Sequence, residues 1–172
     1  TRNSVNRGAA DYTPVFLSVV PDLFRSELIP VDVALIQTSL PDKHGYLSLG
    51  ISVDVVESAV EMADLVVAQV NVNMPRTHGD GFINIKDINF LLPYDEPLLE
   101  YSVKAPNDIV QSIGRYVARI IEDGSTIQVG YGLIPDAVVP NLEGKKDLGV
   151  HTELLSDGIV NLMKKGVVTN RK

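Results

Sequence analysis

The residue of this chain best suited to chemistry is a glutamate at the end of an apolar run. Glu153 closes the short β-prone segment 148–153, so we expect it at the carboxyl end of a strand, where open α/β sheets gather their ligands. A carboxylate in such a place can act as a nucleophile or as a base. Judged on spacing alone, a capping or surface role is the commoner fate of an acidic residue at such a position.

Two glycines earlier in the chain could serve the same reaction. Gly130, Tyr131 and Gly132 follow another predicted strand, and the two glycines, which have no Cβ atom, permit a tight strand-to-helix turn. The backbone N–H groups of Tyr131 and Gly132 could then stabilise an oxyanion, although a Gly-x-Gly segment is more often only a turn. Pro135 stands where a dinucleotide fingerprint needs its third glycine, which disfavours a nicotinamide site.

Further candidate ligands lie in two segments dense in turn residues. His44 belongs to the segment 41–45, and Arg76 and His78 belong to the segment 75–81. Arginine can hold a carboxylate or a phosphate, so Arg76 is a candidate substrate contact. A plain surface loop is the alternative for both segments.

Other catalytic patterns do not fit the sequence. Ser48 lies in Gly-x-x-Ser-x-Gly rather than Gly-x-Ser-x-Gly, which argues against a serine hydrolase. His151 lies two residues before Glu153 and would share its strand face, which suits an orienting role or simple packing. The histidines are not spaced with acids as metal ligands are, so no metal site is expected. With no cysteine in the chain, thiolate chemistry and disulfides are excluded.

The composition is ordinary for a soluble globular protein. The 172 residues include 22 acidic and 15 basic side chains, and the net charge of −7 argues against a broad nucleic-acid surface. We find no apolar run of the roughly 18 residues that a membrane span needs and no signal-peptide pattern. We therefore expect a cytoplasmic protein with neither nucleic-acid nor membrane partners.

The first part of the chain predicts a parallel sheet. A short helical stretch at 14–25 should be interrupted near Pro21, and residues 31–37 and 65–70 read as buried strands. Between them, Asp54 with Glu57 three positions later fits a helix cap for residues 55–63. This order of elements is typical of a βαβ unit: a strand, a long connection, a helix and a second strand.

The second part of the chain also predicts alternating helices and strands. Prolines and acids mark a linker, after which we expect a helix stopped by Gly124, a strand at 126–129, a short helix with Pro135 in its first turn, and the strand ending at Glu153. A helix at 156–165, stopped by Gly166, completes it. The predicted fold class is α/β, with open, mostly parallel sheets and flanking helices. The predicted divisions are 1–92, a linker at 93–106, and 107–172.

Several long motifs, taken in order, resemble the acetyl-CoA hydrolase/transferase family. The likeness runs over essentially the whole chain and is strongest to the 4-hydroxybutyrate or butyrate CoA-transferase branch. The motifs are NRGAADYTP (6–14), PDKHGY (41–46), MPRTHGD (74–80), DGS (123–125), GYGLIPDA (130–137), GVHTE (149–153) and SDG (156–158).

The resemblance implies two related α/β domains: residues 1–92 would be part of the N-terminal CoA-transferase domain and 107–172 the first part of the C-terminal one. It implies that Glu153 is the nucleophile and that Gly130, Tyr131 and Gly132 form its oxyanion and substrate site. Substrate or coenzyme A contacts would fall on His44, Arg76, His78 and His151. Coenzyme A would be a substrate, exchanged between an acyl-CoA and a small carboxylic acid through a glutamyl-CoA thioester, with no permanently bound cofactor.

Three expectations stay open at this stage. Members of the family continue beyond residue 172, so the chain reads as an internal fragment that would be inactive alone. Hydrolysis of acyl-CoA is the close alternative to CoA transfer, and a non-catalytic ligand-binding or assembly module is an alternative of another class. A homo-oligomer is also left open.

Overall fold

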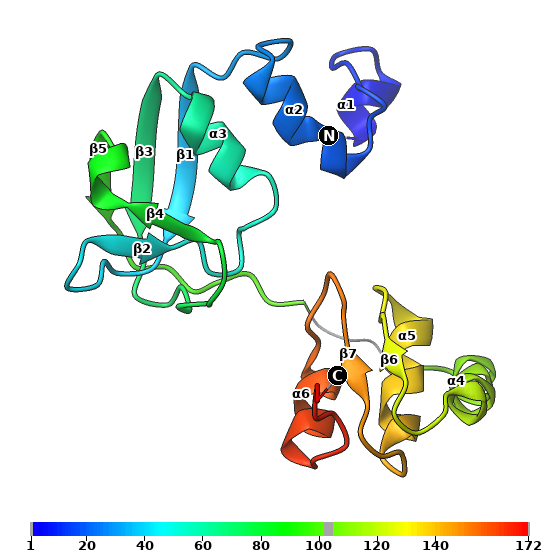
Figure 1. Cartoon of the computed structure of the whole chain (residues 1–172). Coiled ribbons are helices and arrows are strands. Elements are labelled where there is room, and N and C mark those ends of the chain that lie inside the picture. Colours follow the sequence, from blue (N-terminus) through cyan, green and yellow to red (C-terminus); the bar gives the residue numbers. More distant parts are fainter. Residues whose placement is uncertain (1, 102–104, 172) are drawn as a thin grey trace. The chain divides into compact units, whose positions relative to one another are not determined.

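The chain folds into two compact units, residues 1–99 and 100–172, in a computed structural model that describes residues 2–101 and 105–171 (Figure 1). The division falls within the stretch 93–106 assigned to a linker, of which residues 102–104 lie outside the described residues. Both units combine helices with parallel strands, which confirms the predicted α/β class.

The first unit is built on a parallel sheet of three strands. In chain order, its elements are α1 (Arg2–Asn6), η1 (Leu17–Val19), α2 (Val20–Arg25), β1 (Val33–Thr38), β2 (Tyr46–Ser48), α3 (Val56–Met62), β3 (Leu65–Val70), β4 (Phe82–Asn84), η2 (Ile85–Asp87) and β5 (Phe90–Pro93). The strand order is β1-β3-β5, with β3 parallel to both neighbours. Because α3 lies in the connection from β1 to β3, the predicted βαβ unit is confirmed.

Strand β1 is buried on one face only, which corrects the prediction of a fully buried strand. Ala34 and Ile36 lie in the core of the first unit, whereas Val33 and Leu35 on the other face are exposed. Side chains alternate between the two faces of a strand, so the apolar run 31–37 covers both faces while the core of this unit covers one.

Strand β5 was not predicted. Its four residues are all exposed and show no alternation of burial, so the sequence carries no periodic signal for it. Pro93, which was assigned to the linker, is the last residue of β5. Because β5 is an edge strand of the sheet, it tolerates a proline, which has no N–H to donate.

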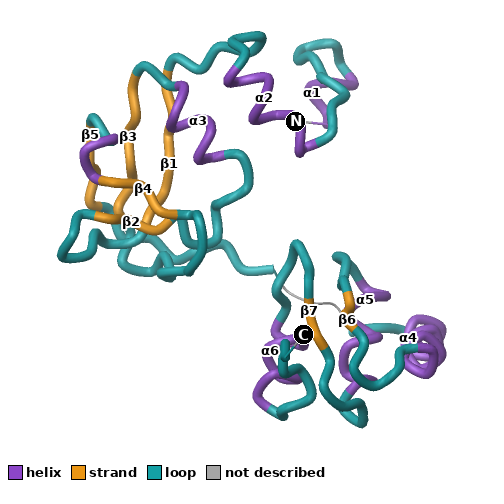
Figure 2. Tube along the Cα trace, viewed as in Figure 1, coloured by secondary structure: helices purple, strands orange, loops and turns teal. Residues whose placement is uncertain are grey.

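A short antiparallel pair, β2 and β4, frames the loops beside this sheet (Figure 2). Tyr46 pairs with Asn84 and Ser48 with Phe82. Leu47 and the following Leu49 are fully buried, so the pair is anchored by apolar packing. This pair fixes one side of the loop that contains His44.

Three local predictions about helix ends are wrong. Pro21 does not interrupt a helix: it lies in the first turn of α2, where its missing N–H has no intrahelical partner to lose. Asp54 does not cap α3, since Val55 occupies the cap position and no side chain caps the helix. Gly124 does not end α4, because the chain already becomes extended at Ile121.

The second unit alternates helices with short parallel strands. Its elements are α4 (Asp108–Ile120), β6 (Thr126–Ile127), α5 (Leu133–Val138), η3 (Val139–Leu142), β7 (Gly149–Val150) and α6 (Asp157–Lys164). Strand β6 is parallel to β7, and Leu148 also forms a parallel bridge with Val168. Pro135 lies in the first turn of α5, as predicted.

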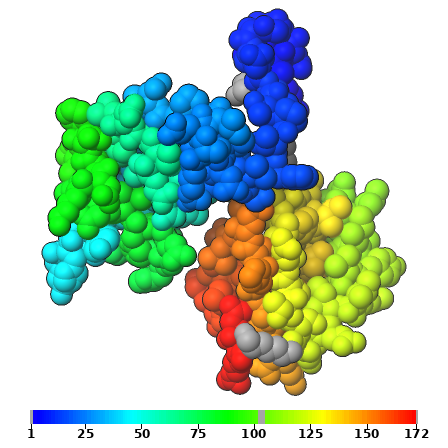
Figure 3. All heavy atoms as spheres, turned by 45° about the horizontal axis from the view of Figure 1, so that its top comes forward, coloured from blue at the N-terminus to red at the C-terminus, as the bar shows by residue number. Residues whose placement is uncertain are grey.

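Helix α4 lies at the surface of the second unit, where its residues appear yellow-green in Figure 3. Its outward side carries the exposed Tyr116, while Gly114 and Ala118 are buried. A Cβ atom on Gly114 would lie 2.8 Å from the carbonyl carbon of Ala137, so the glycine permits the close approach of α4 to α5.

Helix α6 begins and ends as its sequence predicts. The Ser156 hydroxyl accepts a hydrogen bond from the N–H of Ile159 at the N-terminus. At the other end, Gly166 has φ +72° and donates to Met163, and Val167 donates to Leu162. This pair of bonds is the Schellman motif that a glycine at this position favours.

Candidate active site

The main candidate site of the second unit is a cavity between two loops. One loop follows β6 and contains Gly130 and Tyr131, and the other follows β7 and leads to α6. The cavity has a volume of about 230 Å³ and is lined by Tyr101, Val129, Gly130, Tyr131, Asp136, Leu154, Leu155, Ser156 and Asp157. The motif 130–137 and the segment 154–157, which overlaps the motif 156–158, therefore meet at one hollow.

Glu153 lies in the second of these loops and not in a strand. Strand β7 ends at Val150, so the prediction of a strand ending at Glu153 is wrong, and so is the expectation that His151 and Glu153 share a strand face. The reason is that backbone pairing with β6 stops after the N–H of His151 donates to the carbonyl of Ile127 (3.0 Å). Both His151 and Glu153 are exposed.

The carboxylate of Glu153 has no partner in the part of the chain that the structure describes. No hydrogen bond or ion pair holds it among these residues, although Leu154 and Leu155, directly after it, line the cavity. An exposed carboxylate without a partner is free to meet a ligand, and this is what a nucleophile requires.

A threonine ties the two loops together just before they separate. The Thr152 hydroxyl accepts a hydrogen bond from the N–H of Val129 (3.2 Å) and donates one to the carbonyl of the same residue (2.7 Å). Gly130 follows Val129, and Glu153 follows Thr152. The hydroxyl thus joins the residues that directly precede the glycine turn and the glutamate.

The glycine turn ends at the start of α5. Gly132 is the N-cap residue of this helix, with φ +126° and ψ −177°, a conformation open essentially to glycine alone. Its carbonyl accepts a hydrogen bond from the N–H of Asp136 (3.1 Å). Within the described residues, the N–H groups of Tyr131 and Gly132 have no hydrogen-bond partner, so they stay available as donors to a ligand.

Tyr131 contacts a second tyrosine from the predicted linker. The ring centroids of Tyr101 and Tyr131 lie 4.7 Å apart, with the rings tilted by 46°. Hydrogen bonding with Tyr101 raises the pKa of the Tyr131 hydroxyl, and desolvation and the charges of Tyr101 and Asp136 act in the same direction. Tyr131 is therefore neutral at neutral pH and can donate a hydrogen bond at the cavity wall.

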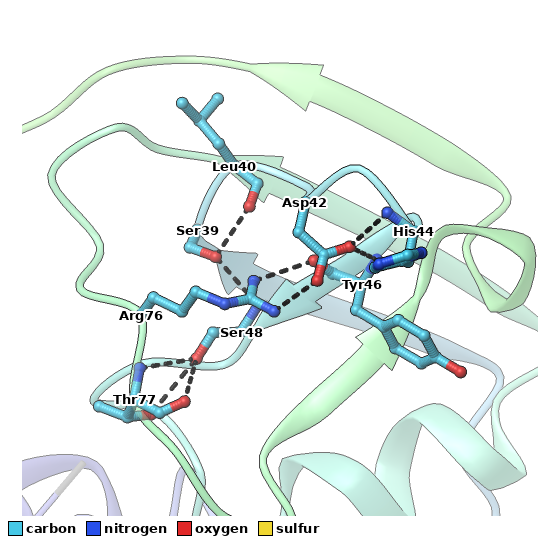
Figure 4. Close-up of polar contacts among 8 residues, drawn as sticks. All are labelled: Ser39, Leu40, Asp42, His44, Tyr46, Ser48, Arg76 and Thr77. Carbon is cyan, nitrogen blue, oxygen red and sulfur yellow. Dashed lines mark hydrogen bonds and ion pairs between the residues drawn. The ribbon is translucent and has the colours of Figure 1, made fainter.

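The polar loops of the first unit form a separate cluster around Asp42 (Figure 4). One Asp42 carboxylate oxygen accepts from the N–H groups of His44 (2.8 Å) and Tyr46 (2.9 Å). The other oxygen pairs with Arg76 (2.7 Å), which also donates to the carbonyl of Tyr46 (3.1 Å). The guanidinium lies 4.6 Å from the centre of the Phe82 ring.

These contacts lower the pKa of Asp42. The hydrogen bond from the N–H of Tyr46 is the main cause; the N–H of His44 and the charges of Arg76 and His44 add to it, while desolvation opposes it. In this arrangement Asp42 and Arg76 hold the loop 41–46 against the loop 75–81. Arg76, a candidate substrate contact in the sequence, already has protein partners.

A second polar cluster lies next to it. The buried Ser48 hydroxyl accepts from the N–H groups of Thr77 (3.1 Å) and Gly50 (3.1 Å). The Ser39 hydroxyl accepts from the N–H of Ser48 (2.9 Å) and donates to the carbonyl of Leu40 (3.0 Å) (Figure 4). Ser48 therefore holds backbone together, which agrees with the exclusion of a serine nucleophile.

The remaining predicted contacts of the first unit are exposed. His44 lies in the turn held by Asp42, and His78 lines another hollow together with Asp80. His44, Arg76 and His78 therefore belong to the first unit, whereas Gly130, Tyr131, Gly132, His151 and Glu153 belong to the second. Of the candidates in the second unit, Gly130 and Tyr131 line the cavity, whereas Gly132, His151 and Glu153 are not among its lining residues. In the first unit, His44 and Arg76 both contact Asp42, whereas His78 lines a different hollow.

Sequence reasoning missed three residues that shape these sites. Asp42 follows Pro41 in a turn, and an Asx turn was a readable signal for its bonds to backbone N–H groups. Tyr101 lies in an aperiodic linker and gave no signal. Thr152 was read only as part of a strand, and its hydroxyl bonds depend on where the strand pairing stops.

Residues 2–101 and 105–171 contain neither a membrane-spanning helix nor a cluster of metal ligands. No helix in them has both the length and the apolar character needed to cross a membrane. No three or more His, Cys, Asp or Glu side chains in these ranges gather in a way that could hold a metal ion.

Comparison with known families gives a clear match. The model of the acetyl-CoA hydrolase/transferase N-terminal domain covers residues 1–128, about three quarters of the chain. The chain belongs to the acetyl-CoA hydrolase/transferase family. This confirms the resemblance drawn from the motifs, three of which, 130–137, 149–153 and 156–158, lie beyond the matched residues.

Curated relatives within the acetyl-CoA hydrolase/transferase family are CoA transferases. The 4-hydroxybutyrate coenzyme A transferase of Clostridium kluyveri is 52% identical over 172 residues, which are 100% of this chain and 40% of that protein. The succinyl-CoA:acetate/propanoyl-CoA:succinate CoA transferase of Fasciola hepatica is 45% identical over 98% of this chain and 36% of that protein. The chain spans about two fifths of the length of these relatives.

Solved structures of similar proteins share the fold of this member of the acetyl-CoA hydrolase/transferase family. The crystal structure of 4-hydroxybutyrate CoA-transferase from Porphyromonas gingivalis has a TM-score of 0.85 and 41% identity, covering 95% of this chain and 42% of that one. RipA from Yersinia pestis has a TM-score of 0.90 and 32% identity, covering 99% and 40%.

Proposed function

We propose that this chain supplies the nucleophile of a CoA-transferase, which moves coenzyme A between an acyl-CoA and a small carboxylic acid. The observation that supports it most is the pair of hydrogen bonds between Thr152 and Val129. Thr152 directly precedes Glu153, whose carboxylate has no partner among the described residues, and Val129 directly precedes the turn with free N–H groups. Relatives of the same family that are named as CoA transferases agree with this function.

The proposed reaction uses a carboxylate and two N–H donors. Glu153 attacks the thioester carbonyl of the acyl-CoA, which forms a mixed anhydride and releases the CoA thiolate. The thiolate then attacks the glutamyl carbonyl and releases the acyl group as a free acid, leaving a glutamyl-CoA thioester. The acceptor acid attacks this thioester in turn, and the same two steps in reverse give the new acyl-CoA and restore Glu153.

Each attack creates a negatively charged tetrahedral oxygen. The N–H groups of Tyr131 and Gly132 are suited to stabilise it, and one such donor typically contributes roughly 3 kcal/mol to the transition state. Coenzyme A enters and leaves as a substrate in this scheme, and no permanently bound cofactor takes part.

The cavity suits a small acyl group. Val129, Leu154 and Leu155 give it apolar walls, and the polar groups of Tyr131 and Asp136 lie among them. We propose acetyl-CoA or butyryl-CoA as donor and 4-hydroxybutyrate or acetate as acceptor, because relatives are named for 4-hydroxybutyrate and for butyryl-CoA with acetate. His44, Arg76, His78 and His151 stay proposed contacts of substrate or coenzyme A, and a cytoplasmic location and a homo-oligomer stay predictions.

Covalent trapping in the full-length protein tests the nucleophile. Incubation with acyl-CoA, followed by borohydride or hydroxylamine, should modify the peptide that contains Glu153. Glu153→Gln should lower CoA transfer by roughly 10³-fold or more, because an amide cannot form the anhydride. Glu122→Gln, which neutralises an exposed acid of the same unit, is the matched control and should leave transfer unchanged.

The same experiment separates the alternatives. Transfer without modification of Glu153, or full activity of Glu153→Gln, would refute the proposed nucleophile. Release of free acid and coenzyme A without an acceptor acid would identify an acyl-CoA hydrolase. Tight ligand binding without turnover would identify a binding or assembly module.

A further inference from the structure

The hydroxyl of Thr152 occupies the point at which the two active-site loops leave the sheet. It satisfies both backbone polar groups of Val129, accepting from the N–H at 3.2 Å and donating to the carbonyl at 2.7 Å. We propose that Thr152 is a positioning residue, which fixes the Glu153 loop against the Gly130–Gly132 turn. This inference rests on the proposed role of Glu153 as nucleophile.

The Thr152 hydroxyl forms hydrogen bonds at the point where backbone pairing between the two strands ends. The last backbone hydrogen bond between the two strands joins the N–H of His151 to the carbonyl of Ile127 (3.0 Å). Beyond it, the described residues of the two loops, 128–132 and 152–156, share no hydrogen bond other than the two formed by Thr152. The side chain therefore extends the pairing from Ile127 to Val129 on one strand and from His151 to Thr152 on the other.

The two hydrogen bonds of Thr152 lie next to the groups that are proposed to react, so their loss should affect the reaction rate. Val129 directly precedes the turn that presents the N–H donors, and Thr152 directly precedes the carboxylate that attacks. A misplacement of about 1 Å between reacting groups can cost about 10²-fold in rate. Without the Thr152 hydroxyl, no hydrogen bond among the described residues would join the two loops.

Thr152 itself does not act on the substrate in this scheme. Its single O–H donates to Val129, and one of its lone pairs accepts from Val129. Both Thr152 and Val129 are half-buried, so water can replace these bonds only in part. The threonine acts through the geometry of its neighbours.

Two substitutions in the full-length protein test the proposal. Thr152→Val keeps the shape and removes the hydroxyl, and Thr152→Ser keeps the hydroxyl. For Thr152→Val we expect kcat to fall about 10²-fold with KM for acyl-CoA almost unchanged, and single-turnover labelling of Glu153 to slow in parallel. For Thr152→Ser we expect kcat within about threefold of the wild-type value.

Three results would overturn the positioning role: a wild-type kcat in Thr152→Val, an equal loss in Thr152→Ser, or a change confined to KM. Circular dichroism at the assay temperature checks that each variant is folded, and Thr152→Ala, judged by the same criteria, replaces Thr152→Val if that variant is not. Glu153→Gln separates this proposal from the proposed function. If it stays active, the nucleophile is misassigned; if it is inactive while Thr152→Val is normal, only the positioning role fails.

Discussion

Two carboxylates of this chain illustrate how surroundings decide the role of a side chain. Asp42 accepts two backbone N–H groups and pairs with Arg76, so its charge is used within the protein. Glu153 is exposed and has no partner among the described residues. The first carboxylate is suited to holding loops together, and the second is suited to meeting a ligand.

The bonds of Asp42 predict an acid-sensitive contribution to stability. The pKa of Asp42 in the folded protein is lower than its ordinary value of 3.8, so the carboxylate favours the folded state above that pH. The contribution is lost as the pH falls through the lowered folded pKa. The difference in melting temperature between wild type and Asp42→Asn should therefore be greatest near neutral pH and shrink below about pH 4.

Thermal melts at a series of pH values measure this effect. Asp80→Asn, in the neighbouring loop, is the control for loss of one negative charge, because the Asp80 side chain has no hydrogen bond or ion pair among the described residues. A difference for Asp42→Asn that stays constant down to about pH 3 would show that the charge of Asp42 does not contribute to stability.

At the scale of elements, the sequence predicted long periodic segments well and short ones poorly. The apolar spacing of 109–121 and the Ser156 and Gly166 signals located α4 and α6, because packing and caps both leave a mark in the sequence. Strand β7 has two residues, so the extent of its pairing with β6 is set by the fold and not by a pattern. That is why the ordered motifs singled out Glu153 but could not place it in a loop.

The glycine turn gives a test of backbone conformation. Gly132 has φ +126°, and no heavy atom lies within 4 Å of the place that a Cβ would occupy. Any cost of Gly132→Ala therefore comes from the backbone and not from a collision, and we expect a loss of roughly 1–3 kcal/mol in the free energy of unfolding.

Gly144→Ala is the matched control for this change. Its Cβ would also meet nothing within 4 Å, but Gly144 is not among the glycines with positive φ. Denaturant unfolding of both variants measures the difference. Equal stability of the two would show that the backbone at Gly132 relaxes without strain.

At the scale of the whole chain, each unit has a hydrophobic core of its own. The core of the first unit includes Val66, Ala68 and Leu49, and that of the second includes Leu148, Ile159 and Leu162. Each of these two clusters draws all its residues from one unit. A defect in one core should therefore be felt first in the unit that contains it.

Hydrogen exchange can detect this separation. Leu148 is fully buried, and Leu148→Ala should cost about 2–5 kcal/mol because it leaves a cavity. We expect faster amide exchange in residues 105–171 and unchanged exchange in the sheet of the first unit. Leu49→Ala, at an equally buried site, should give the opposite pattern, and loss of protection in both units from either change would contradict the prediction.

The strand before Glu153 lies between two neighbours. On one side β7 pairs with β6; on the other, Leu148 accepts from the N–H of Thr169 and donates to the carbonyl of Val167, both at 2.9 Å. A ribosome releases the chain from its N-terminus, so Glu153 emerges before Val167 and Thr169 do. During synthesis the proposed nucleophile therefore passes through a stage in which its strand has only one neighbour, and the residues of the second neighbour emerge only after those of α6.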